Sequence, residues 1–283
     1  MRCLGQRSFP SAGLRIAALA VILQLGFARP GLAAAAEPED TWAALAGEIF
    51  KGRPLADGGA LLGIEMPARA EDAALVPVTM RVTLPPGDPR RLRSLTLVID
   101  ENPVPVAATF TFGDDAGVSM ISTRVRVNSY TNVHLVAELS DGGLYVTTAY
   151  VKASGGCSAP AAKNPDEAIA SLGRMKLRLF GGAAAAPAGA PREAQIMLRH
   201  PNNSGLQRDQ VTLLYVPANF VDDLRVWQGD APLFRMTAGI SISEDPSFRF
   251  TYAPNGAATF RVEAHDTSGK VFRGEWPANG SQM

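Results

Sequence analysis

Apolar and polar residues alternate with a period of two over most of this chain. In the segment 76–84, apolar residues alternate with Pro77, Thr79, Arg81 and Thr83. A period of two places successive side chains on opposite faces, which is typical of a strand buried on one side. The alternation therefore constrains the chain to fold mainly into sheets.

The first half of the chain repeats this pattern in short runs, with turns rich in Gly, Pro and Asp between them. Further strands are expected at residues 95–99, 106–112, 119–127, 133–139 and 144–151. No amphipathic helix separates these runs, so the pattern favours an antiparallel sandwich over a βαβ fold. A short helix with one apolar face is expected over residues 41–50, before the first strand.

The period of two returns near the end of the chain. Strands are expected at residues 194–199, 211–216, 224–227, 233–242, 248–252, 259–264 and 271–276. The predicted fold is therefore all-β, with two antiparallel β-sandwich domains at residues 37–153 and 192–283. The sequence leaves open whether the two sandwiches pack against each other.

The connection between the sandwiches, residues 163–191, combines a short helix with a linker. Asn164 is a candidate N-cap and Pro165 suits the first helical position, so a helix is expected over 165–172. Residues 181–191 contain only Ala, Gly and Pro, a composition typical of linkers. Residues 175–180 alternate like an edge strand, which either sandwich could accept.

Residues 1–36 have the organisation of a secretory signal peptide. Arginines precede an apolar run at residues 16–27, and small residues at 31–36 offer a cleavage site. An uncleaved membrane anchor is the alternative, although the run is short for a span. Cleavage would remove four arginines and no acid, leaving 23 basic and 27 acidic residues, a balance that argues against nucleic-acid binding.

Cys157 is the one cysteine expected in the mature protein, because Cys3 belongs to the leader. Gly155, Gly156 and Ser158 surround it with very small side chains, which predicts a flexible cysteine arm over residues 154–162. Three readings are open: a reactive or cargo-bearing thiol, an intermolecular disulfide, and a residue without a role.

Other candidate sites have weaker patterns. The histidines His134, His200 and His265 lack the close spacing of a zinc motif, so no metal site is expected. The acidic pairs at 114–115 and 222–223 are interpreted as turns or solvated edges rather than catalytic carboxylates. No nucleophile elbow, phosphate loop or dinucleotide fingerprint occurs, so the chain is not expected to be an enzyme.

Several short motifs carry a resemblance to a known family. Residues 102–110, 122–126 and 137–142, with Gly155-Gly156-Cys157, resemble SoxY, the carrier subunit of the periplasmic sulfur-oxidation system. Residues 199–201, 204–209 and 217–220 resemble its partner subunit SoxZ. The chain therefore looks like a fused SoxYZ-like carrier, similar to those associated with periplasmic quinoprotein dehydrogenases.

The resemblance implies immunoglobulin-like sandwiches and a periplasmic carrier that is not a catalyst. Cys157 would hold a covalent sulfur-containing cargo on its arm and present it to partner enzymes, among them those of a quinoprotein dehydrogenase system. No cofactor other than this cargo is implied, and neither nucleic acid nor membrane is an expected partner. The alternative is a two-domain binding or assembly module whose cysteine only forms an intermolecular disulfide.

One departure from the family pattern concerns the arm. In SoxY the cysteine lies in a Gly-Gly-Cys-Gly-Gly sequence at the end of the chain. Here Ser158, Ala159 and Pro160 follow it, and the chain continues into the second sandwich. An arm tethered at both ends could enter a partner only as a loop.

Overall fold

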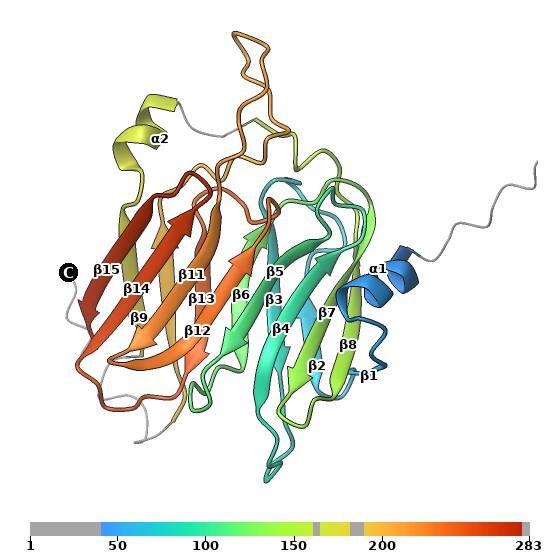
Figure 1. Cartoon of the computed structure of the whole chain (residues 1–283), viewed down its shortest axis with the longest axis vertical. Helices are drawn as coiled ribbons and strands as arrows, with labels where there is room; N and C mark the ends of the chain where they lie inside the picture. The colour runs from blue at the N-terminus through green and yellow to red at the C-terminus, as the bar shows by residue number, and fades with distance from the viewer. Residues whose placement is uncertain (1–40, 161–164, 182–189, 279–283) are drawn as a thin grey trace, which may run out of the picture. The chain divides into compact units, whose positions relative to one another are not determined.

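The computed structural model describes residues 41–160, 165–181 and 190–278, which belong to one compact unit (Figure 1). The predicted signal peptide, residues 161–162 of the cysteine arm and most of the predicted linker lie outside the described residues. Within the described part, no helix is long and apolar enough to cross a membrane.

Two sheets form this unit, and each contains strands from both halves of the chain. The first sheet has nine strands in the order β1 (Leu55–Asp57), β8 (Leu144–Val151), β7 (Thr131–Leu139), β4 (Leu92–Ile99), β5 (Val106–Phe112), β12 (Ala231–Ala238), β11 (Val221–Gln228), β14 (Thr259–Asp266) and β15 (Val271–Pro277). The second sheet has six, in the order β2 (Leu62–Glu65), β3 (Val76–Val82), β6 (Met120–Val125), β13 (Ser247–Tyr252), β10 (Arg192–Leu198) and β9 (Met175–Phe180).

The two predicted sandwiches are joined edge to edge. Strand β5 of the first half pairs antiparallel with β12 of the second, from Ala108 opposite Ala238 to Phe112 opposite Phe234. In the other sheet β6 pairs with β13 through residues 121–122 and 249–250. Each half therefore completes the sheets of the other, which gives one continuous two-layer sandwich (Figure 1).

The core lies between the two sheets and follows the alternation in the sequence. Strand β3 shows this pattern, because Val76, Val78 and Met80 are completely buried while Pro77 and Arg81 are exposed. Aromatic side chains link the layers across the junction of the halves. Their ring contacts are Phe110–Phe248, at 6.1 Å between centroids, and Phe234–Phe250, at 5.0 Å.

The prediction of an all-β sandwich fold is confirmed, and so are both short helices, α1 (Thr41–Ile49) and α2 (Pro165–Ser171). Strand β9, which the sequence could not assign, belongs to the second half as an edge beside β10. The short strands β1 and β2 were not predicted.

One predicted strand is wrong. Residues 211–216 form no strand and belong to a loop over residues 203–219, which projects beyond the ends of the strands (orange in Figure 1). Val211 is 89% exposed and Leu214 69%, so the apolar residues that suggested a strand contact no sheet. Isolated bridges, Asn203 with Asn219 and Arg208 with Tyr215, hold the two sides of this loop together.

Candidate functional site at the cysteine arm

Cys157 is completely buried, with 0% of its surface exposed, and it forms no disulfide. The expectation of an exposed thiol on a flexible arm is therefore wrong for this structure. Residues 154–160, the described part of the arm, lie against both halves of the sandwich, and each residue from 155 to 159 takes part in a hydrogen bond. The predicted role of Cys157 as an attachment site is a separate matter, which the burial alone does not test.

The first half of the chain holds the beginning of the arm. The backbone N–H of Gly155 donates to the Asn128 carbonyl at 2.8 Å, and that of Gly156 donates to the Val127 carbonyl at 3.0 Å. Gly155 has a positive φ of 78°, which turns the chain back toward the sandwich. These two bonds hold the backbone that follows β8, whose last residue is Val151.

Gly156 has a second, steric reason to be glycine. A Cβ added there would lie 2.0 Å from the carbonyl oxygen of Ala73 and 2.6 Å from that of Val127. Both atoms belong to the backbone and cannot move away by changing a rotamer. Small residues in the arm therefore permit close packing, whereas the sequence analysis interpreted them as a sign of flexibility.

The second half of the chain holds the end of the arm through the base of the 203–219 loop. The Ser204 hydroxyl donates to the Cys157 carbonyl at 2.5 Å, and Nε2 of Gln207 donates to the Ala159 carbonyl at 3.0 Å. Both side chains are at most 4% exposed. The cysteine is thus enclosed at the junction where the two halves meet.

Ser158 follows the cysteine and forms a turn in the arm. Its backbone N–H and its hydroxyl both contact the Gly155 carbonyl at 3.2 Å. The resulting turn spans Gly155 to Ser158 and directs Cys157 inward. Ser158 itself is exposed.

Arg126, which follows β6, is the charged residue that acts electrostatically on Cys157. Its Nη1 donates to the Gly156 carbonyl at 3.2 Å, and only 1% of the residue is exposed. Burial raises the pKa of the Cys157 thiol to about 11, and the positive charge of Arg126 opposes this rise only in part. In the enclosed state the thiol is therefore protonated and unreactive at neutral pH.

A network of buried polar side chains surrounds Arg126 and ties the halves together. Nδ2 of Asn102 donates to the Arg126 carbonyl at 2.8 Å and to the Ser241 hydroxyl at 2.9 Å. The Ser243 hydroxyl donates to the Ala74 carbonyl at 2.6 Å. Asn202 has a positive φ of 44°, and its Nδ2 reaches the carbonyls of Ile242 and Ser243 at 3.2 Å.

Sequence reasoning gave no role to Arg126, Asn202, Ser204 or Gln207. Some of them lie in the stretches that carried the family resemblance, but polar residues in short motifs do not reveal that they will be buried. The sequence pattern nearest to these residues was the largely polar segment 200–209 between two predicted strands, and this pattern predicted only a loop.

The structure does not bring the three histidines together. His134 lies between Asp100 and Thr148 and stacks on Trp42, at 3.7 Å between ring centroids. His200 contacts Asn202 and Asp266, and His265 contacts Glu263. Among the described residues no group of three or more His, Cys, Asp or Glu side chains could hold a metal ion.

The acidic pairs occupy different environments. Asp114 and Asp115 form exposed ion pairs with Arg93 and Arg91 in a turn, as expected. The interpretation of residues 222–223 as a turn or solvated edge is wrong for Asp223. This residue lies within β11, is 9% exposed and pairs with Arg225 and Arg235.

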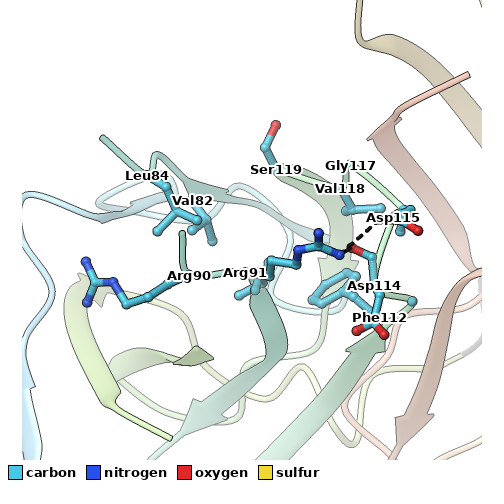
Figure 2. A pocket seen from close by; sticks show the side chains of 13 residues that line it. Val82, Leu84, Arg90, Arg91, Phe112, Asp114, Asp115, Gly117, Val118 and Ser119 are labelled. Carbon is cyan, nitrogen blue, oxygen red and sulfur yellow. Dashed lines mark hydrogen bonds and ion pairs between the residues drawn. The ribbon is translucent and has the colours of Figure 1, made fainter. Parts of the chain in front are cut away.

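A pocket of about 400 Å³ lies beside the 114–115 turn, at the opposite ends of β5 and β6 from the arm. Figure 2 shows Arg91 extending across this pocket toward the turn. Apolar side chains such as Leu84 and Phe112 line the remainder. Because its arginines pair with neighbouring aspartates, the pocket presents no free cluster of catalytic or ligand-binding groups.

The protein is thus an all-β, two-layer sandwich. Its two halves share both sheets and enclose a cysteine at their junction. Two family models match it in sequence order. Residues 46–157 match the family model of the sulfur oxidation protein SoxY, and residues 182–277 match that of the sulphur oxidation protein SoxZ. The chain belongs to the SoxYZ family, as a SoxY domain fused to a SoxZ domain.

Solved structures show similarity to single parts of the chain. The sulfur carrier protein SoxY from Chlorobium limicola f thiosulfatophilum is 23% identical and has a TM-score of 0.31, covering 39% of this chain and 89% of its own. A putative superoxide reductase from Thermotoga maritima is 15% identical, with a TM-score of 0.30, covering 35% of this chain and 92% of its own. No curated protein matches the chain.

Proposed function

We propose that this protein is a covalent carrier, which holds a sulfur-containing intermediate on Cys157 and presents it to partner enzymes. The observation that carries the proposal is the position of Cys157, because the SoxY match ends at this residue and hydrogen bonds hold the arm on both sides of it. Such contacts exchange readily with water when a segment leaves its site.

Delivery requires the arm to alternate between two states. In the closed state the thiol is buried, and with a pKa of about 11 its thiolate fraction at pH 7 is on the order of one in ten thousand. Once the arm opens, the pKa returns toward the ordinary range and the thiolate fraction rises to a few per cent. The closed state therefore protects the sulfur, and the open state reacts.

The finer parts of the proposal concern place and partners. We place the carrier in the periplasm, because a signal-like leader precedes it. Since the chain continues after Pro160, the arm would enter a partner as a loop, which needs a wider opening than a free chain end. The resemblance to SoxYZ-like carriers associated with quinoprotein dehydrogenases makes such a system a candidate partner. The cargo on Cys157 would be its only prosthetic group.

The test is the intact mass of the protein isolated from its native host without reductant. A carrier should show adducts that disappear after treatment with dithiothreitol and are absent from a Cys157→Ser variant. A protein carrying only a free thiol, or only a disulfide to a second copy of itself, would contradict the proposal. The second of these results would support the assembly module instead.

A further inference from the structure

Arg126 is a charged side chain in an environment that disfavours charge. It is 1% exposed and is among the largest completely buried side chains of the described structure. A guanidinium keeps its proton in proteins even when burial lowers its pKa, as burial does here. The junction between the two halves therefore contains a buried positive charge.

The hydrogen bonds of Arg126 satisfy this charge poorly. Nη1 donates to the Gly156 carbonyl at 3.2 Å and Nη2 to the Asn202 carbonyl at 3.5 Å, while Nε has no partner. In the part of the chain that the structure describes, no carboxylate forms an ion pair with this guanidinium. A buried cation with no anion bonded to it directly is costly, so the donors of this guanidinium are incompletely satisfied.

Cys157 is the group best placed to supply the missing anion. Arg126 binds the carbonyl of the residue immediately before the cysteine, and the two side chains influence each other electrostatically. The negative charges of Glu244 and Asp72 also act on Arg126, that of Glu244 more than Cys157, but neither residue lies on the arm. Cys157 alone belongs to the arm and can bring a new chemical group into the site.

We propose that Arg126 is a specificity-determining residue, which makes the closed arm retain a cargo with a negatively charged group in preference to a neutral or positively charged one. The inference rests on the proposed carrier function, because it concerns the cargo attached through Cys157 Sγ. A guanidinium binds sulfonate-like or carboxylate groups through parallel N–H donors, and Nε is available for this.

The test uses two adducts of similar size and opposite charge on the exported protein, in which Cys157 is the one cysteine expected. The reagents are 2-sulfonatoethyl methanethiosulfonate and 2-(trimethylammonio)ethyl methanethiosulfonate. In each case the Cys157 thiolate attacks the sulfenyl sulfur of the reagent, a disulfide forms and methanesulfinate leaves. Each adduct is prepared in urea, the protein is refolded, and the rate of release by dithiothreitol is measured in native buffer and in urea.

The ratio of the urea rate to the native rate is the protection that the closed arm gives each adduct. We expect the anionic adduct to be protected about tenfold more than the cationic one in the unaltered protein. In Arg126→Gln this preference should disappear, whereas Arg126→Lys should retain part of it. Arg124→Gln is the matched control and should retain all of it, because Arg124 contacts the Asp245 carbonyl instead.

Equal protection of the two adducts in the unaltered protein would overturn the inference, and so would a preference that survives in Arg126→Gln. The first comparison needs no variant, so it decides the matter even if Arg126→Gln does not fold. Because both adducts are made chemically, this test is independent of native cargo. Absence of a native adduct would refute the carrier function, whereas equal protection of the two adducts in the unaltered protein would refute only the role of Arg126.

Discussion

The two ends of the double sandwich use polar side chains in opposite ways. At the arm end they are buried and join the halves, as with Asn102, Arg126, Asn202, Ser204, Gln207, Ser241 and Ser243, all at most 4% exposed. At the pocket end they are ion pairs in contact with solvent, such as Arg91–Asp115, whose side chains are 56% and 92% exposed. Cutting a buried hydrogen bond leaves its partner unsatisfied, whereas water replaces an exposed one.

The difference fits the proposed opening and closing of the arm. A segment that is held and then released needs contacts that are strong when buried and that water can replace when exposed. Buried backbone and side-chain hydrogen bonds have this property. The comparison therefore predicts that equivalent substitutions will have unequal effects at the two ends.

The largest effect is expected from Gly156→Ala. The new Cβ would collide with the Ala73 carbonyl, so the arm should leave its closed site, and alkylation of Cys157 by iodoacetamide at pH 8 should accelerate at least about tenfold. Gly155→Ala is the control, because its Cβ would have only Ser158 Oγ nearby, at 4.0 Å, and would suffer backbone strain of about 1 kcal/mol. Equal acceleration in both variants would show that packing does not close the arm.

The next effect is expected from Asn202→Ala. This change leaves the carbonyls of Ile242 and Ser243 and the N–H of Val221 without their partner, in a residue with a positive φ. The free energy of unfolding in urea should fall by about 3 kcal/mol. Asn255→Ala, which removes hydrogen bonds near the pocket end, should cost about 1 kcal/mol. A larger loss in Asn255→Ala would reverse the comparison.

Acid should weaken the arm end through His200. Burial lowers the pKa of this side chain, and hydrogen bonds with Asp266 and Asn202 oppose the shift only in part. Below the unfolded-state pKa of about 6.5 the unfolded chain binds the additional proton, so stability is lost as the pH falls toward the lowered folded-state value. Urea denaturation between pH 7 and pH 5 should show this loss, and His200→Gln should reduce it. An identical loss in that variant would assign it to other groups.

The smallest effect is expected from Arg91→Gln at the pocket end. Its ion pair with Asp115 is exposed on both sides, so the free energy of unfolding should change by less than about 0.5 kcal/mol. Iodoacetamide should also react with Cys157 at an unchanged rate. A loss comparable to that of Asn202→Ala would mean that the pocket end holds the fold as tightly as the arm end.

Most strands could be predicted because burial on one side leaves a period of two in the sequence. The exceptions have physical causes. Strand β1 has only three residues and none of them is buried, so it leaves no pattern. Residues 211–216 are apolar but contact no sheet, and composition alone cannot distinguish an exposed apolar segment from a buried one.

The sequence drew attention to Cys157 as a candidate site but did not predict its buried environment. Glycines beside a thiol are compatible both with a mobile arm and with close packing against a backbone, and only the contact of Gly156 with Ala73 separates the two. The burial of Arg126 and Asn202 depends on strands that are distant in sequence. No local pattern could have revealed it.

The shared sheets have a consequence for how the protein assembles. Separate halves would each expose two unpaired strand edges, β5 and β6 on one and β12 and β13 on the other. Such edges promote fibrils and mispairing with foreign strands. A single polypeptide carries both halves, so each strand edge meets its complement at a high local concentration. Dilution therefore cannot separate the two halves, and neither half is made in excess of the other.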